Sequence, residues 1–102
     1  MSNLLDSILQ KYPSAEGETI QQAFELAQKA HGGQKRDSGE DYIIHPLKVA
    51  QILADLNLDY EAVAAALLHD VLEETEVTAE NIQKEFGPGI AFLVQAVTKL
   101  HR

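Results

Sequence analysis

The stretch from Ala62 to Thr75, AVAAALLHDVLEET, constrains the fold of this chain more than any other. It begins as a run of Ala, Val and Leu without Gly or Pro, and Asp59 before it is a candidate helix cap. This composition predicts a buried helix. The C-terminal end of the same stretch carries four ionisable residues, which are His69, Asp70, Glu73 and Glu74.

On one continuous helix these four side chains would form a polar strip, because residues three or four apart share a face. Acidic groups near a helix C-terminus oppose the helix dipole and repel one another. A local rule broken in this way indicates either a solvated helix end or a site that holds a cation. We favour the cation site, and the rest of the chain must then supply further ligands.

Apolar residues recur at helical spacing in the other long segments, so the sequence predicts an all-α fold, a helical bundle of about six helices. We expect a short first helix that ends before Tyr12, followed by a linker over Ser14–Gly17. A second helix then runs to Gly32, and a glycine-rich loop leads to a third helix that starts at Pro46. Beyond the central run, Thr78 is a candidate cap for a short helix. Gly87 and Pro88 are expected to separate that helix from the last one.

With 102 residues the chain is long enough for one domain with a modest core. We divide it into a short helix and linker over residues 1–17 and a domain over residues 18–102. The final helical pattern still runs at Leu100 without a Gly or Pro stop, so we expect the domain to be truncated and the chain to be a fragment of something longer.

The formal net charge of −8 argues against binding nucleic acid or an anionic membrane surface through bulk electrostatics. The chain has no cysteine, which excludes disulfides, thiolate metal sites and thiol nucleophiles. Its start resembles no secretory signal, and no apolar run is long enough to span a membrane. We therefore expect a cytoplasmic protein.

His45, just before the proline that opens the third helix, is a candidate partner for the pair His69-Asp70. Imidazole and carboxylate ligands without a thiolate suit manganese, iron, zinc or nickel better than calcium. Glu73 and Glu74 could then orient a water molecule or protonate a leaving group. A single helical histidine is more often a buried structural residue, so spacing alone leaves that interpretation open.

Three segments together resemble one known family: AHGGQKRDSGEDYIIHPLKVAQILADL, AALLHDVLEET and FGPGIAFLVQAVTKL. They are similar, in order and spacing, to the N-terminal HD hydrolase domain of the RelA/SpoT (Rel) family, over roughly residues 20–100. The resemblance implies an all-α fold of the HD superfamily. It also implies a manganese-dependent hydrolase that removes the 3′-pyrophosphate from the alarmone (p)ppGpp, leaving GDP or GTP.

Within this resemblance, His45, His69 and Asp70 correspond to metal ligands. Glu73 and Glu74 correspond to an acidic pair that acts on the attacking water. In the loop before the third helix, Arg36 and Ser38 correspond to residues that contact the guanine nucleotide, with Lys35 as a further candidate.

The chain departs from the family pattern in three places. Glu74 stands where the family usually has Asp, and Asp41 stands where the loop more often has Pro. The family's fourth metal ligand, an Asp downstream of the TKL motif, has no counterpart before Arg102. We therefore expect this fragment to bind metal weakly and to be a weak or inactive hydrolase.

Three alternatives remain open at this point. The chain could be an HD phosphohydrolase of another nucleotide, a non-catalytic regulatory HD domain of a (p)ppGpp synthetase, or an interaction module without catalytic function. The glycine-rich loop argues against the first alternative, and the presence of His69-Asp70 argues against the second. A fragment with an exposed apolar helix face could also associate with itself.

Overall fold

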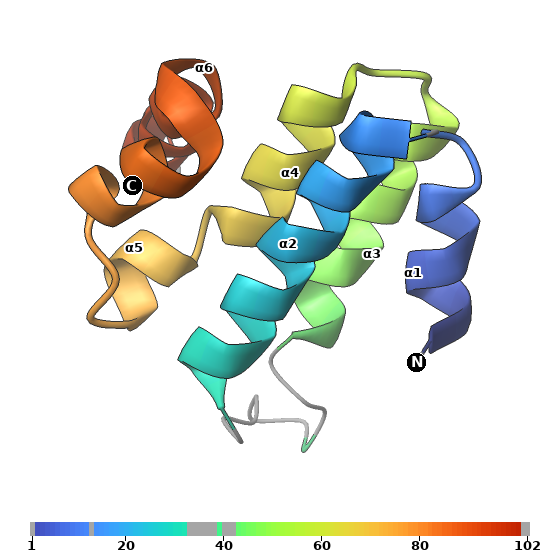
Figure 1. Ribbon diagram of the computed structural model, residues 1–102. Helices are drawn as coiled ribbons and strands as arrows, with labels where there is room; N and C mark the ends of the chain where they lie inside the picture. Colours follow the sequence, from blue (N-terminus) through green and yellow to red (C-terminus); the bar gives the residue numbers. More distant parts are fainter. Residues whose placement is uncertain (1, 13, 33–38, 40–42, 101–102) are drawn as a thin grey trace.

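Helix α4 (Tyr60–Leu68) lies at the centre of the molecule because its sequence offers no polar face. Each residue from Val63 to Leu68 is buried, with at most 5% of its surface exposed. Asp59 caps the helix as predicted, since its Oδ1 accepts a 3.0 Å hydrogen bond from the Ala62 N–H. A helix that is apolar all round needs neighbours on several sides. Helix α4 packs against three of them, which are α2 (Ser14–His31), α3 (Ile44–Asp55) and α6 (Ala79–Leu100) (Figure 1).

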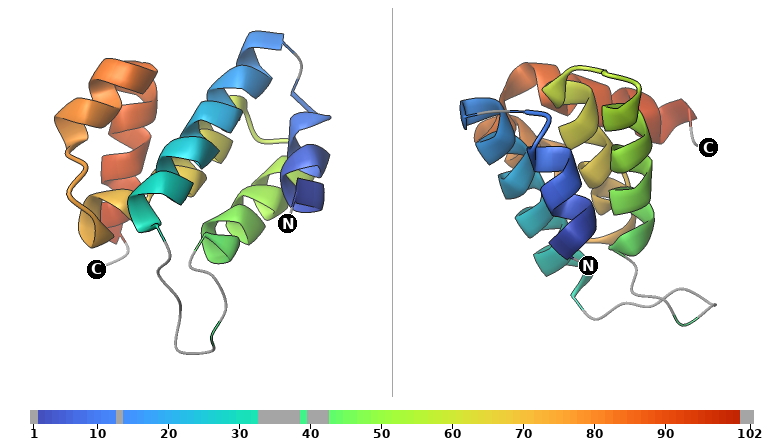
Figure 2. Two further views of the ribbon diagram at one scale, coloured as in Figure 1. Left: turned by 60° about the horizontal axis from the view of Figure 1, so that its bottom comes forward. Right: turned by 90° about the vertical axis from the view of Figure 1, so that its right-hand side faces the viewer.

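The computed structural model describes residues 2–12, 14–32, 39 and 43–100. Within these ranges every regular element is a helix, so the predicted all-α class is confirmed. The two remaining helices are α1 (Ser2–Leu9), which packs on α2 and α3, and α5 (Val71–Glu74), which connects α4 to α6. Figure 2 shows α2, α3 and α4 side by side, with α6 on one flank and α1 on the other. No helix of the described part is long and apolar enough to cross a membrane.

The interpretation of Ser14–Gly17 as a linker is wrong, because these residues form the first turn of α2. Gly17 lies in this turn, where it makes room for the backbone of the segment before α2. A Cβ atom at this position would lie 2.4 Å from the backbone oxygen of Tyr12. The first helix also shares the main core, since Ile8 and Tyr12 belong to the same buried cluster as α4. The predicted division of the chain into residues 1–17 and a domain over residues 18–102 stays a prediction.

The predicted continuous helix over Ala62–Thr75 is also wrong. Helix α4 ends at Leu68 and α5 begins at Val71, with His69 and Asp70 in a turn between them. The four ionisable residues of this stretch therefore do not share one helix, and the turn places two of them at a junction.

Helix α6 consists of two arms, as the sequence predicted from Gly87 and Pro88. Thr78 and Asn81 cap its start reciprocally: each side-chain oxygen accepts a 3.1 Å hydrogen bond from the other residue's backbone N–H. Gly87 then leaves the helical conformation, with φ of 91° and ψ of 168°. Only glycine adopts this region readily, so the kink is fixed by the backbone itself.

Candidate metal centre

His69 and Asp70 are buried polar residues at the junction of α4 and α5, with 4% and 7% of their surface exposed. The Nδ1 atom of His69 lies 2.7 Å from the backbone oxygen of Ala66. A carbonyl oxygen only accepts hydrogen bonds, so Nδ1 must carry the hydrogen. In a continuous helix the same oxygen would accept from the N–H of Asp70. The imidazole therefore takes the bond that would have joined α4 to α5.

This hydrogen bond decides which nitrogen of His69 is available for a ligand. With the hydrogen on Nδ1, a neutral ring presents the lone pair of Nε2. Nε2 lies 3.1 Å from Oδ1 of Asp70. Two electron-rich atoms this close, in a site that water hardly reaches, repel each other unless a cation lies next to both. The geometry therefore fits a protonated imidazole or a metal ion that binds the two atoms together.

His45 supplies the third donor from a different helix. The structure starts α3 at Ile44, earlier than the predicted start at Pro46, so His45 lies in the first helical turn. Proline is tolerated there because the first N–H groups of a helix have no partner within it. Ile43 and Leu47, on either side, are buried and hold this turn against the core.

The donor atoms of His45, His69 and Asp70 all lie within 4.8 Å of one another. The two imidazole rings meet edge-on, with centroids 6.3 Å apart and planes inclined by 62°. Bonds of about 2.0–2.2 Å place two ligands of one ion at most about 4.4 Å apart. The group therefore needs to contract only slightly to hold an ion, and two imidazoles with one carboxylate are a donor set that transition metals accept.

The side chains of the other predicted site residues are not described by the structure. Glu73 and Glu74 lie in α5, about one turn after Asp70, but the positions of their carboxylates are outside what the structure describes. Lys35, Arg36 and Ser38 lie within residues 33–38, outside the described residues. Their predicted roles stay predictions.

A cavity of about 350 Å³, which was not predicted from the sequence, adjoins the two histidines. Its wall on α3 is a stripe at helical spacing, formed by His45, Val49 and Leu53. The ring of His69 and apolar residues of α4 and α6 form the rest of the wall. These apolar residues are Ala62, Ala65, Ala66, Leu93 and Val97. The stripe on α3 was visible in the sequence, but its opposing wall depends on how α6 packs.

A family model described as "HD domain" matches residues 23–102. The chain is 52% identical over 96 residues to the guanosine-3′,5′-bis(diphosphate) 3′-pyrophosphohydrolase of Aquifex aeolicus (strain VF5). It is 46% identical over 99 residues to the bifunctional (p)ppGpp synthase/hydrolase SpoT of Escherichia coli (strain K12). These alignments include 94% and 96% of this chain.

A third relative carries a different name: the probable GTP pyrophosphokinase of Mycobacterium leprae (strain TN) is 50% identical over 91 residues, or 89% of this chain. The chain spans only 12–14% of the length of these three relatives. A solved structure described as a metazoan ortholog of SpoT that hydrolyses ppGpp matches with a TM-score of 0.75 and 35% identity. That match covers 85% of this chain and 49% of the other. The resemblance predicted from the motifs is thereby confirmed.

Proposed function

Because this chain belongs to the HD domain family, we propose that it forms the hydrolase site of a RelA/SpoT-type (p)ppGpp 3′-pyrophosphohydrolase. One observation carries the proposal: two separate helical segments bring His45, His69 and Asp70 together. They do so in a chain about half identical to proteins named for this hydrolysis. The substrate would be guanosine 3′,5′-bis(diphosphate) or its pentaphosphate.

The reaction is a hydrolysis that needs no oxidant or second substrate. The oxygen of a water molecule attacks the phosphorus attached to the 3′-oxygen of the ribose, and the bond from this phosphorus to the 3′-oxygen breaks. The 3′-oxygen leaves as a hydroxyl group after it takes a proton, so the products are pyrophosphate and GDP or GTP.

His45, His69 and Asp70 would hold a divalent metal ion, which we propose to be manganese. Such an ion, when bound, lowers the pKa of the attacking water and offsets negative charge on the phosphoryl oxygens. The hydrogen bond from His69 Nδ1 to the Ala66 oxygen fixes the ring so that Nε2 faces the site. Three protein ligands leave room for water and substrate, as in catalytic sites.

We assign proton transfer to the acidic pair Glu73 and Glu74. One carboxylate would accept a proton from the attacking water, and its acid form would return a proton to the 3′-oxygen. This assignment rests on the resemblance and on their sequence position one turn after Asp70. Arg36 and Ser38, with Lys35, are proposed to bind the guanine nucleotide on the same grounds.

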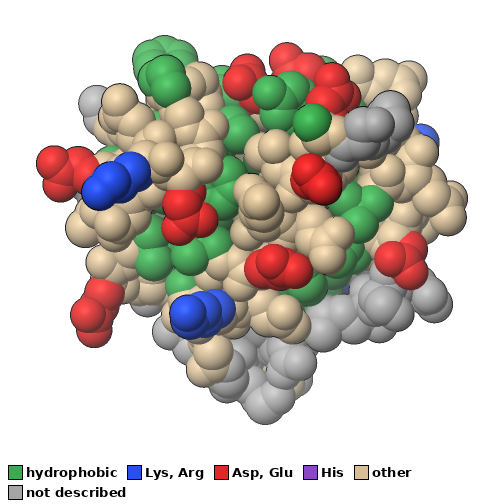
Figure 3. All heavy atoms as spheres, in the orientation of Figure 1, with side chains coloured by type: hydrophobic (Ala, Val, Ile, Leu, Met, Phe, Trp, Pro, Cys, Tyr) green, Lys and Arg blue, Asp and Glu red, His purple; other side chains and the backbone are tan. Residues whose placement is uncertain are grey.

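The charge of the chain makes local cations necessary for such a substrate. The net charge is −8, and acidic side chains are spread over the face seen in Figure 3. A polyphosphate approaching this surface meets a repulsive field. The metal and the basic residues Lys35 and Arg36 would offset it, whereas the acidic surface gives nucleic acid no comparable attraction. We propose a cytoplasmic location for this hydrolase of a guanine nucleotide.

A second candidate is a regulatory HD domain of a (p)ppGpp synthetase. The relative named probable GTP pyrophosphokinase favours it. A domain of that kind would bind the nucleotide without hydrolysing it, and it would not need the buried ligand pair His69-Asp70. The presence of both residues, in a geometry that suits a cation, makes hydrolysis the better-supported function.

A hydrolysis assay with ppGpp and manganese tests the proposal. We choose single-turnover conditions, with protein in excess, because we expect a weak metal site and slow turnover from three protein ligands. Asp70→Asn should lower the rate at least about 100-fold, since losing even a hydrogen-bond partner of a metal ligand costs 10- to 100-fold. Glu80→Gln, an equal change on an exposed residue of α6, should leave the rate unchanged. Nucleotide binding without any hydrolysis would favour the regulatory function instead.

A further inference from the structure

Helix α5 (Val71–Glu74) carries both glutamates to which we assign proton transfer, yet it consists of a single turn between α4 and α6 (Figure 1). The first turn of a helix fixes several residues for one backbone hydrogen bond, so four residues do not form a stable helix by themselves. At the junction with α4, the imidazole of His69 also takes the oxygen of Ala66. Other groups must therefore hold the turn of α5 closed.

Thr75, the residue after α5, closes this turn with its backbone and with its side chain. Its backbone N–H donates to the Val71 oxygen over 3.1 Å. Its hydroxyl donates to the same oxygen over 2.7 Å. A carbonyl oxygen has two lone pairs and can accept both hydrogen bonds. The residue after α5 is thus bonded twice to the first residue of the helix.

The hydroxyl of Thr75 also binds the segment that leads to α6. Its oxygen accepts a 3.2 Å hydrogen bond from the backbone N–H of Val77, which directly precedes the capping residue Thr78. Val71 is fully buried, and Val77 packs against the hydrophobic core. One hydroxyl therefore joins the turn of α5 to the start of α6 through two residues that the core holds in place.

We propose that Thr75 is a positioning residue for the acidic pair Glu73 and Glu74. Its hydroxyl fixes the backbone turn from which both side chains extend. The inference rests on the proposed function, in which these glutamates transfer protons. Such groups must come within hydrogen-bond reach of the reacting atoms, at about 2.6–3.2 Å. A turn that opens would move them out of reach while the rest of the fold stays intact.

The position of Thr75 separates its role from that of the metal ligands. Asp70 precedes the acidic pair and lies in the buried junction, whereas Thr75 follows the pair. The pair is therefore held between two points, of which only the first belongs to the candidate metal centre. Loss of the Thr75 hydroxyl should thus affect proton transfer and leave metal binding unchanged.

Single-turnover hydrolysis of ppGpp with manganese, measured with the whole chain over a range of protein concentrations, tests this inference. Thr75→Val replaces the hydroxyl by a methyl group and keeps the β-branched shape. It should lower the rate constant at saturating protein about tenfold to 100-fold, the cost of a misplaced catalytic group. The half-saturating protein concentration and the manganese affinity should not change. Thr75→Ser keeps the hydroxyl and should restore most of the rate.

A substitution cycle separates positioning from general stabilisation. If Thr75 acts through the acidic pair, Thr75→Val should have little further effect once Glu73→Gln and Glu74→Gln are both present, because residues that act as a unit are not additive. A general loss of folded protein would lower the rate by the same factor in both backgrounds, which would overturn the inference.

Thr19→Val is the matched control. The hydroxyl of Thr19 donates to the Ala15 oxygen over 3.1 Å, which is the same kind of bond to the carbonyl four residues earlier, but on α2. This variant should hydrolyse ppGpp as fast as the wild type. An equal loss of rate in Thr19→Val and Thr75→Val would contradict a specific role of Thr75.

Amide hydrogen exchange gives a second readout that needs no catalysis. In Thr75→Val the Val77 N–H loses its acceptor, so its exchange should become about fivefold faster. Unchanged exchange there would overturn the inference. So would a wild type and a Thr75→Val variant that hydrolyse ppGpp equally fast, and this result would leave the proposed function intact. A wild type without any hydrolysis would instead overturn the proposed function, and the role of Thr75 with it.

Discussion

The junction between α4 and α5 and the kink inside α6 both interrupt a helix, but different chemistry holds each of them. At the junction the backbone keeps ordinary right-handed angles, with φ and ψ of −62° and −33° at His69. The break arises from the imidazole, which takes the hydrogen bond of the Ala66 oxygen. At the kink, Gly87 adopts angles that other residues avoid, and no side chain is needed to hold it.

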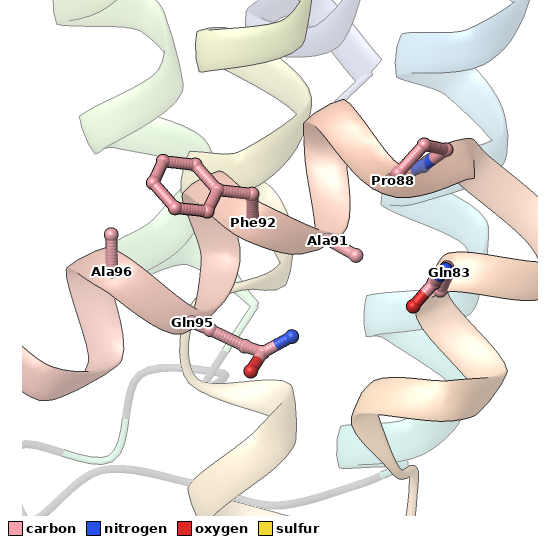
Figure 4. A pocket seen from close by; sticks show the side chains of 6 residues that line it. All are labelled: Gln83, Pro88, Ala91, Phe92, Gln95 and Ala96. Carbon is pink, nitrogen blue, oxygen red and sulfur yellow. The ribbon is translucent and has the colours of Figure 1, made fainter.

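The two breaks also have opposite consequences. The junction turns buried ionisable groups toward each other and makes a candidate site for a cation. The kink turns the apolar ring of Phe92 outward, beside a hollow where the two arms of α6 meet (Figure 4). An interruption held by a side chain can respond to what that side chain binds, whereas one held by the backbone cannot. Metal should therefore affect the first region and leave the second unchanged.

Substitution of Gly87 by alanine should have the largest effect on stability. The added Cβ atom would find no atom within 4 Å, so the effect would come from backbone strain alone. Such strain amounts to about 1–3 kcal/mol, which should appear as a lower free energy of unfolding in urea. Gly32→Ala, at the end of α2 where φ is not positive, is the control and should cost less. A change below about 0.5 kcal/mol for Gly87→Ala would show that the kink can move to another residue.

Tyr12→Phe should lower stability less than Gly87→Ala does, and its effect should not depend on the α4–α5 junction or on the kink of α6. The hydroxyl of Tyr12 donates a hydrogen bond to the backbone oxygen of Leu58, and the side chain is 8% exposed. Its loss should lower the free energy of unfolding by about 1 kcal/mol. The loss should be the same with and without manganese, because Tyr12 lies outside the candidate metal centre. A loss that depends on metal would contradict the separation of the two regions.

Tyr12 also predicts an alkaline limit of stability. Burial, followed by the charges of Asp59 and Glu16, raises the pKa of the phenol above its ordinary value of 10.0. The folded state thus binds the proton more tightly than the unfolded state. This contribution is present below pH 10 and is lost as the pH rises through the folded-state pKa. Unfolding measured from pH 8 to 11 should show the decline in the wild type and a weaker decline in Tyr12→Phe.

Glu61→Gln should have the smallest effect on the free energy of unfolding. The effect should arise at the kink, where the second arm of α6 begins. The carboxylate of Glu61 on α4 lies at the start of the second arm of α6, where a Cβ on Gly89 would be 2.8 Å from Glu61 Oε2. A negative charge at a helix N-terminus stabilises by about 0.3–1 kcal/mol, and salt screens this effect. The difference in unfolding free energy between wild type and Glu61→Gln should shrink as sodium chloride increases. A difference that salt does not change would point to packing instead.

The kink and the caps could be predicted from sequence, whereas the junction could not. Asp59, Thr78 and the pair Gly87-Pro88 act on residues within one turn, so local composition reveals them. The break at His69 depends on one side chain competing with a backbone N–H, and the same residues would also suit a continuous helix. The close approach of the Tyr12 oxygen to Gly17, within the segment expected to be a linker, could not be predicted from local composition either.

The candidate site was predicted in part. His45, His69 and Asp70 were named as metal ligands, and the structure brings their donor atoms together. The cavity beside them was missed because Val49 and Leu53 meet Leu93 and Val97 only after α3 and α6 have packed. The hollow beside Phe92 was missed for a similar reason, since it exists only where the two arms of α6 meet.

The most direct test of the account is a calorimetric titration of the metal-stripped chain with manganese. The wild type should bind one ion, and His69→Ala should abolish this binding. Glu80→Gln, which removes an exposed carboxylate of α6 outside the group of three, should bind like the wild type. Binding that survives His69→Ala, or that Glu80→Gln removes, would contradict the placement of the metal at the junction of α4 and α5.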